Sequence, residues 1–154
     1  MEDVAGIYAR ESGYLDCHVQ VGIAQGRAIS VAFPAEPEPD AETDHELLDR
    51  IEAYLRGERD DLADVTVALT MATDRRAVLE SVREIPYGEQ ATVEQVARMT
   101  PDRDPEDGGD RRLVREALAD NPVPLFVPDH RVRDGPSGAP PAVEQRLRSI
   151  EGLS

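Results

Sequence analysis

The sequence predicts an α+β fold, with a small N-terminal α/β domain built on a short antiparallel sheet and a helical C-terminal domain. The first observation behind this prediction is an alternation of apolar and polar residues in the N-terminal third, which is typical of half-buried strands. The second is a set of later segments whose apolar residues recur at helical spacing, separated by stretches rich in Pro and Gly. We place the two domains at residues 1–70 and 71–154.

Two strands joined by a turn are predicted near the N-terminus. Residues 14–24 form the first strand, and its apolar face consists of Leu15, Cys17, Val19 and Val21. Gln25-Gly26 has the composition of a tight turn, so residues 27–33 should return as a second strand. The Pro-rich acidic segment 34–43 predicts a loop after this hairpin.

One helix and one further strand complete the predicted N-terminal domain. Asp44 is a suitable N-cap for a helix that runs to about Arg56, because Leu48, Ile51 and Leu55 follow at helical spacing. The apolar run Val65–Leu69 predicts another short strand.

The C-terminal domain begins with two predicted helices. Thr73 is the expected N-cap of a helix over residues 73–84, which the following Pro-Tyr-Gly sequence stops. Thr92 and Gln95 have the spacing of a capping box, so a short helix should run from there to about Arg98.

A third and a last helix follow an acidic loop at residues 100–110. The third covers Arg111 to Ala119 and ends before Asn121-Pro122, and the last covers Ala142 to Ile150. A short helix, a connector and a second helix predict a helix-turn-helix, whose second helix enters a DNA groove. The domain is therefore expected to be winged-helix-like.

The charge composition restricts the possible functions. The chain has 32 acidic and 17 basic residues, a net charge of −15, and every basic residue is Arg. The absence of Lys excludes Schiff-base catalysis, a pyridoxal anchor and a P-loop. An excess of carboxylates keeps a surface hydrated when salt screens their repulsion, so the composition indicates a haloarchaeal protein. An acidic protein of ordinary cytoplasm is the alternative.

The charge is also unevenly distributed. Residues 1–70 carry 16 acidic residues and 5 Arg, whereas residues 111–154 carry 6 acidic residues and 7 Arg. A surface for nucleic acid on an acidic protein requires such an asymmetry, although chance can also produce it.

We predict a cytoplasmic protein. The N-terminus has no apolar stretch typical of a signal peptide, and no apolar run approaches the roughly 20 residues of a membrane helix. The single cysteine, Cys17, allows no intrachain disulfide and is expected to be buried and inert on its strand. We expect no metal and no cofactor.

The most informative segment is NPVPLFVPDHRV, from Asn121 to Val132. It resembles the active-site signature of the O6-alkylguanine-DNA alkyltransferases, or methylated-DNA–protein-cysteine methyltransferases, which is Asn-Pro, a short apolar run and Pro-Cys-His-Arg-Val. Asp129 stands where this signature has its alkyl-accepting cysteine. The similarity covers residues 73–152, about half of the chain, and includes the IPYGE segment at 85–89 and the terminal Glu151-Gly152.

This resemblance implies roles for eight residues. Arg112 corresponds to the arginine that occupies the space of a flipped base, and Asn121 to the turn-forming residue beside the reactive site. His130 and Glu151 correspond to the hydrogen-bonded pair that deprotonates the cysteine through water. Because Asp129 cannot form a thioether, the site is expected to be degenerate, with no catalytic residue. The residues expected to contact DNA are Arg111, Arg112, Arg115, Asn121 and Arg131.

Structural explanations of the same residues remain open. Arg112 could be a solvated helix-surface residue, and Asn121 could cap the end of a helix. His130 and Glu151 could keep their bond for structural reasons alone. Asp129 and His130 could recruit a metal, but two adjacent ligands do not make a site.

Two departures from the family pattern concern the handling of a base. Val93 occupies the position of a family aromatic that turns the target phosphate and assists the leaving base. The loop Arg133–Pro141 is shorter and lacks the family's substrate-contacting Tyr.

Three functions remain in competition. The favoured one is a non-catalytic, alkyltransferase-like monomer that recognises alkylated or distorted bases in double-stranded DNA and hands them to a repair-protein partner. The second is an Asp-dependent DNA dealkylase, in which Asp129 forms an ester that water hydrolyses. The third is a protein-interaction scaffold that keeps only the fold.

Overall fold

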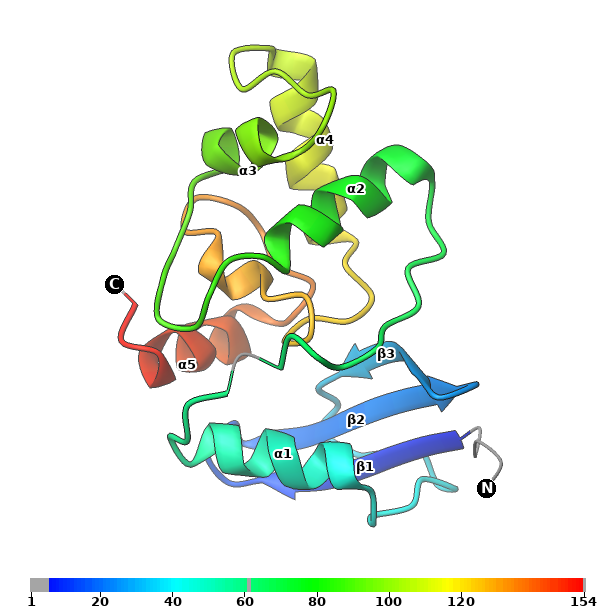
Figure 1. Ribbon diagram of the computed structural model, residues 1–154. Coiled ribbons are helices and arrows are strands. Elements are labelled where there is room, and N and C mark those ends of the chain that lie inside the picture. Colours follow the sequence, from blue (N-terminus) through cyan, green and yellow to red (C-terminus); the bar gives the residue numbers. More distant parts are fainter. Residues whose placement is uncertain (1–5, 61, 154) are drawn as a thin grey trace.

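The N-terminal part of the chain contains a three-stranded antiparallel sheet in the order β1-β2-β3 (Figure 1). The strands of this computed structural model, which describes residues 6–60 and 62–153, are β1 (Gly6–Ser12), β2 (Cys17–Ala24) and β3 (Arg27–Ala32). The predicted turn is confirmed, since Gln25 and Gly26 adopt the left-handed φ values of 54° and 73° that a tight hairpin requires. The α+β fold class is confirmed as well.

The strand β1 was not predicted. Its register pairs Tyr8 with Val21 of β2, and both side chains are buried. The predicted first strand began at residue 14, but residues 13–16 form the turn between β1 and β2, with Asp16 at a φ of 57°. The alternating pattern therefore identified this strand correctly, but the strand begins at Cys17, three residues later than predicted.

The helix α1 (Glu46–Leu55) packs beside the sheet and buries Leu48, Ile51 and Tyr54. Its N-cap is His45, whose Nδ1 accepts a hydrogen bond from the backbone N–H of Leu47 at 3.0 Å. The prediction of Asp44 as the cap was wrong by one residue, because the imidazole supplies the acceptor instead.

Residues 65–69 do not form the predicted strand. A single bridge joins Val67 to Ala28 of β3, and Ala28 donates its N–H to the carbonyl of Thr66 at 2.9 Å. The carbonyl of Val65 accepts from the guanidinium of Arg83 at 2.7 Å, which removes it from strand pairing. The domain boundary near residue 71 stays a prediction.

The C-terminal part is helical and lies above the sheet in Figure 1. Three of its helices, α2 (Thr73–Val82), α3 (Val93–Met99) and α4 (Gly108–Ala119), pack on one another. A short 3-10 helix, η1 (Asp129–Arg131), packs against the last helix, α5 (Pro141–Ile150). After Ala32, the described part of the chain has isolated bridges rather than paired strands, so a wing is not confirmed.

The helix ends agree with the sequence in part. The capping box of Thr92 and Gln95 is present in both directions. Thr73 is the first residue of α2 rather than its cap, and the cap Ala72 makes no side-chain bond. The helix α4 begins three residues before the predicted Arg111, because Asp107 accepts from two backbone N–H groups of the first turn.

One hydrophobic core extends from the sheet into the helices, since buried residues of both parts form a single cluster. The backbone N–H of Val31 on β3 donates to the carbonyl of Pro122 at 2.9 Å, which joins the sheet to the segment after α4. Within the described residues, no helix has the length and apolar character needed to cross a bilayer.

Candidate functional site: a sealed aspartate beside a buried polar cluster

Asn121 organises the turn that follows α4. Its Oδ1 accepts from the N–H of Val123 at 3.0 Å, and its Nδ2 donates to the carbonyl of Val127 at 3.2 Å. The same Nδ2 donates to Oδ2 of Asp129 at 2.9 Å. Asn121 is buried, so it shapes this turn and cannot reach a ligand at the surface.

Asp129 has no exposed surface, and both of its carboxylate oxygens are occupied. Oδ1 accepts from the hydroxyl of Ser137 at 2.6 Å, and Oδ2 accepts from the N–H of Gly138 at 2.8 Å as well as from Asn121. Burial raises the pKa of Asp129, and the three donors offset this effect only in part. The carboxylate therefore has no oxygen that faces solvent.

The loop at residues 133–140 closes over this carboxylate. A Cβ at Gly138 would overlap the backbone carbonyl of Asn121, so only glycine allows this close approach. Val93 is also enclosed, because it is 1% exposed and donates its N–H to Asp134 of the same loop at 2.7 Å. The position of the family aromatic therefore holds a buried aliphatic side chain.

Glu151 is the centre of a second buried cluster. Its Oε2 lies 2.7 Å from Nε2 of His130 and 2.5 Å from the hydroxyl of Tyr54. Its Oε1 accepts from Nε of Arg131 at 2.8 Å and from the N–H of Gly88 at 3.0 Å. The cluster thus joins α1, the turn before α3, η1 and the end of α5.

The charges of this cluster compensate one another. Burial alone would raise the pKa of Glu151, but hydrogen bonds from His130 and Arg131 outweigh it and hold the pKa well below its usual range. Burial and the neighbouring Glu151 carboxylate raise the pKa of Tyr54, so its hydroxyl keeps its proton and acts as a donor. Nδ1 of His130 is buried without a hydrogen-bond partner among the described residues.

The predicted DNA contact Arg131 must be corrected. Its side chain is 2% exposed, its guanidinium forms the buried ion pair with Glu151, and Nη1 donates to the carbonyl of Ile85 at 2.7 Å. A buried and fully engaged guanidinium cannot contact a phosphate or a base.

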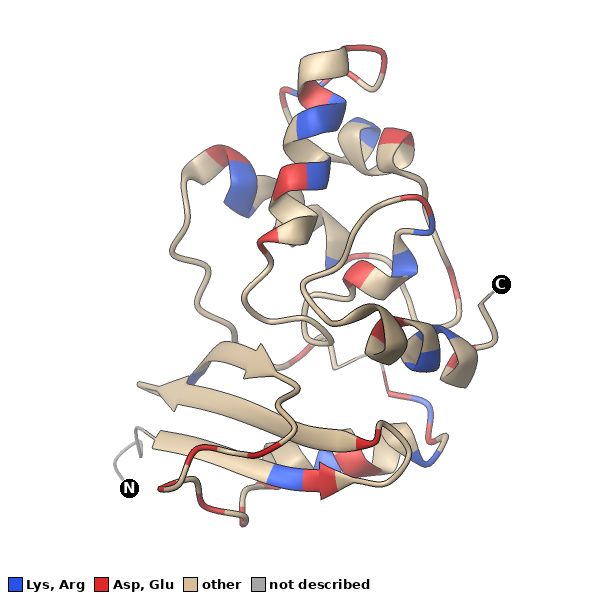
Figure 2. Cartoon of the chain, turned by 180° about the vertical axis from the view of Figure 1, so that it is seen from behind, with Lys and Arg blue, Asp and Glu red and all other residues tan. Residues whose placement is uncertain are grey.

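The other predicted arginines lie on α4, whose basic positions alternate with acidic ones (Figure 2). The side chain of Arg112 is 80% accessible, and its Nε donates to Glu116 one turn later at 3.1 Å. Arg111 donates to the carbonyl of Pro105 at 2.9 Å, and Arg115 is exposed. These residues do not share a cleft with Asp129, because Asp129 is sealed.

Three residues of the site were not predicted from the sequence: Ser137, Gly138 and Tyr54. Ser137 and Gly138 lie in a Pro- and Gly-rich segment whose composition predicts a turn but does not indicate that the turn contacts Asp129. Tyr54 could have been found, since it follows Ile51 at helical spacing.

The described residues contain no group of three or more His, Cys, Asp or Glu placed to hold a metal. Cys17 lies half-buried on β2, and burial raises the pKa of its thiol, which weakens it as a nucleophile.

The sequence was compared with known proteins. Residues 74–146 match the pattern of the 6-O-methylguanine DNA methyltransferase, DNA binding domain. A methylated-DNA–protein-cysteine methyltransferase of Methanopyrus kandleri is 37% identical over 128 residues, which are 80% of this chain and 92% of the relative. A DNA base-flipping protein of Thermus thermophilus is 32% identical over 101 residues, 65% of this chain and 64% of that protein.

Solved structures show the same fold. The O6-methylguanine methyltransferase of Mycobacterium tuberculosis superposes with a TM-score of 0.70 at 21% identity, covering 97% of this chain and 92% of that one. The OGT of the same organism in complex with DNA gives a TM-score of 0.70 at 20% identity, covering 95% and 90%.

Proposed function

Because the chain belongs to the family of methylated-DNA–protein-cysteine methyltransferases, we propose that it is a non-catalytic member that binds double-stranded DNA and recognises alkylated or distorted bases in repair. The observation that carries this proposal is Asp129, which the motif resemblance aligns with the acceptor cysteine and which has no exposed surface and three hydrogen-bond donors on its oxygens. A sulfur atom that could keep an alkyl group is absent there.

The buried carboxylate also argues against the dealkylase alternative. An attacking oxygen must come into contact with the alkyl carbon, and both oxygens of Asp129 are buried and hydrogen-bonded within the protein. A base flipped out of the duplex would reach Asp129 only after residues 133–140 moved away from it. No side chain that could protonate a leaving guanine is present at position 93, where Val93 is buried.

The proposed contact with DNA is made by α4. Arg112 and Arg115 are exposed on it, so their guanidinium groups can reach phosphates or base edges. The similarity to a DNA base-flipping protein and to an alkyltransferase solved with DNA supports this placement. We infer that the protein acts as a monomer with a C-terminal DNA-binding domain starting near residue 71.

Salt is an important variable for this proposal. The lysine-free, acidic composition supports a haloarchaeal source, and phosphate contacts lose affinity steeply as salt rises. Recognition in concentrated salt must therefore depend on contacts to bases and on the shape of the duplex more than on charge.

A gel-shift titration in potassium chloride tests DNA recognition. The probes are a duplex with one O6-methylguanine and the same duplex with guanine. We expect tighter binding to the methylated duplex, and we expect Arg112→Ala to weaken it roughly tenfold, the loss of one base or phosphate contact. Arg27→Ala, an exposed arginine on β3, is the matched control and should change nothing. Equal and negligible binding of both duplexes would remove the proposal.

Mass spectrometry of the protein after exposure to the methylated duplex tests the absence of transfer. We expect no lasting methyl group on the polypeptide, because neither oxygen of Asp129 is accessible. Release of more than one methanol per protein, abolished by Asp129→Asn, would favour the dealkylase instead.

A further inference from the structure

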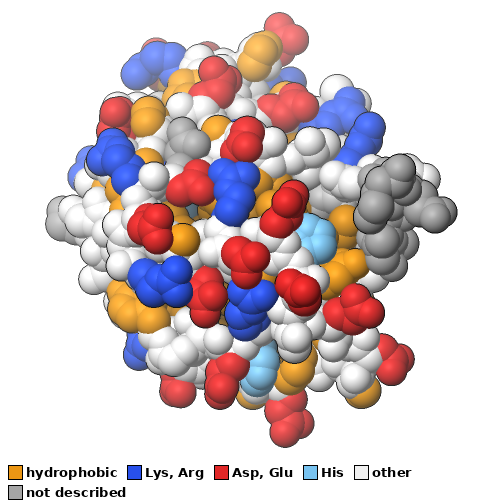
Figure 3. Space-filling model, turned by 60° about the horizontal axis from the view of Figure 1, so that its bottom comes forward, with side chains coloured by type: hydrophobic (Ala, Val, Ile, Leu, Met, Phe, Trp, Pro, Cys, Tyr) orange, Lys and Arg blue, Asp and Glu red, His pale blue; other side chains and the backbone are white. Residues whose placement is uncertain are grey.

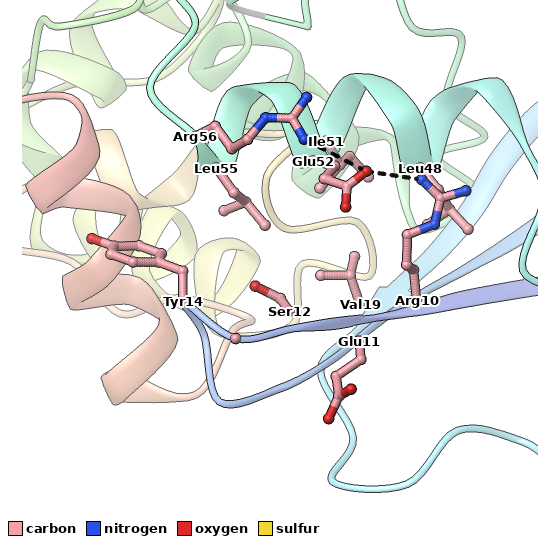
Figure 4. Close-up of a pocket in the computed structure, with 11 residues that line it drawn as sticks. Arg10, Glu11, Ser12, Tyr14, Val19, Leu48, Ile51, Glu52, Leu55 and Arg56 are labelled. Carbon is pink, nitrogen blue, oxygen red and sulfur yellow. Dashed lines mark hydrogen bonds and ion pairs between the residues drawn. The ribbon is translucent and has the colours of Figure 1, made fainter.

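A hollow of about 180 Å³ opens between the end of β1 and the last turns of α1 (Figure 4). Val19 projects into it from the sheet and Leu55 from the helix, with Ile51 behind them. It shares no lining residue with the networks of Asp129 and Glu151. The floor is therefore apolar and separate from the site described above.

Of the four charged side chains that line the hollow, Arg10, Glu52 and Arg56 are already engaged, and Glu11 points away from it (Figure 4). Arg10 donates to Asp49 at 2.8 Å, to Glu52 at 3.3 Å and to the carbonyl of Thr43 at 2.6 Å. Glu52 also lies 3.9 Å from the guanidinium of Arg56. With these groups satisfied, the hollow offers little to hold the polar head of a small molecule. It can select instead for shape and apolar surface, which a single large aliphatic or aromatic side chain supplies.

One end of the hollow is fixed to the C-terminal part of the chain. Tyr14 is 42% exposed, its hydroxyl donates to the carbonyl of Arg146 on α5 at 3.1 Å, and the guanidinium of Arg146 lies 5.7 Å from the centre of its ring. Arg146 also donates to the backbone carbonyl of Tyr14. The rim is thus held in place before any ligand arrives, which lowers the entropic cost of binding.

The surface beside the hollow is acidic. Figure 3 shows this face, where carboxylates dominate around a few arginines. The exposed carboxylates of the loop before α1 and of α1 itself are Glu36, Glu38, Asp40, Glu42, Asp44, Glu46, Asp49 and Glu52. Such a surface repels phosphates and a second copy of this acidic chain, and it attracts a cationic segment.

We propose that the hollow docks a basic segment of a partner protein, which inserts one large apolar side chain flanked by Lys or Arg. The apolar floor supplies most of the affinity, and the carboxylates along α1 select for cationic side chains that come into direct contact with them. This role is independent of DNA binding through α4, so a single molecule can hold DNA and a partner together.

Gly13 permits a clean test. It lines the hollow, and a Cβ added there meets nothing within 4 Å, so Gly13→Leu is compatible with the fold and adds an apolar side chain at the rim of the hollow. Ala72→Leu places the same side chain on an exposed residue before α2 and is the matched control. A library of random 12-residue peptides is selected on the wild-type chain and counter-selected on Gly13→Leu.

The selected consensus and its affinity decide the outcome. We expect a Leu, Phe or Met between basic residues, with NMR shifts confined to residues 10–14 and 48–56. Changing the central residue to Ala should weaken binding about tenfold or more, Gly13→Leu should abolish it, and Ala72→Leu should not affect it. DNA affinity should be the same in Gly13→Leu as in the wild type.

Three results would overturn the inference. The first is a library with no enrichment or with an acidic or wholly polar consensus. The second is binding that Gly13→Leu leaves intact. The third is a concentration-dependent dimer in sedimentation that Gly13→Leu abolishes, which would make a second copy the occupant.

Discussion

Replacing Asp129 with Asn separates the charge of this buried side chain from its shape. The amide oxygen can accept from Asn121 and Gly138 as Oδ2 does now, and its NH₂ can donate to the hydroxyl of Ser137. The bonds from Asn121 and Gly138 are preserved and the bond with Ser137 is reversed in direction, so the main difference between the two proteins is the free energy of the ionised carboxylate.

The pH dependence follows from the raised pKa of Asp129. A carboxyl whose pKa is raised by folding contributes stability that is fully present below its unfolded pKa of about 3.9 and is lost as pH rises through its folded pKa. Each unit of the rise corresponds to about 1.4 kcal/mol. We expect Asp129→Asn to match the wild type near pH 4 and to become the more stable protein as pH rises, with the difference growing by at most about 1.4 kcal/mol per pH unit until the folded pKa is reached.

Urea unfolding followed by circular dichroism, at fixed ionic strength between pH 4 and 8, measures this difference. Asp40→Asn, at an exposed carboxylate of the acidic loop, is the control and should change the free energy of unfolding by less than about 0.5 kcal/mol at every pH. The reasoning would be refuted if the free energy of unfolding of the wild type rose relative to that of Asp129→Asn as pH increases. That result would mean that the three donors outweigh the burial of the charge.

Three further predictions concern the residues around the site. Tyr54→Phe should lower the free energy of unfolding by about 1–2 kcal/mol in urea, because Glu151 loses a buried donor; no change would show that the bond is not formed in solution. Glu151→Gln should cost about 3–5 kcal/mol, because Arg131 becomes an uncompensated buried charge; a cost under about 1 kcal/mol would contradict this. Gly138→Ala should displace the loop from Asn121 and expose Asp129 to solvent, visible in NMR spectra; an unchanged spectrum would refute the close packing.

Local signals in the sequence were sufficient where neighbours along the chain decide the structure. The capping box of Thr92 and Gln95 set the start of α3, and Gln25-Gly26 set the hairpin between β2 and β3. The same reasoning chose the wrong N-cap for α1. Asp44 is the stronger candidate by residue type, but the ring nitrogen of His45 caps the helix instead. A difference of one residue in a cap cannot be resolved without the backbone geometry.

The site shows where residue type alone is insufficient. Arg131 has the chemistry of a DNA contact, but its position on η1 points it at Glu151 and Ile85 inside the protein. The partnership of Asp129 with Ser137 and Gly138 depends on how a loop folds back over η1. No periodicity or capping pattern encodes that contact, so it could not be predicted.

The aspartate and the loop above it are matched to each other. A cysteine at position 129 would present one sulfur, which is a weak acceptor, where two carboxylate oxygens now bind three donors. The carboxylate ties Asn121 on one side to Ser137 and Gly138 on the other, so Asp129 holds the loop closed over its own side chain. The pair of His130 and Glu151 persists beneath this closure because Arg131 and Tyr54 bind the same carboxylate. The proposed recognition of DNA is therefore assigned to the exposed face of α4, outside the sealed site.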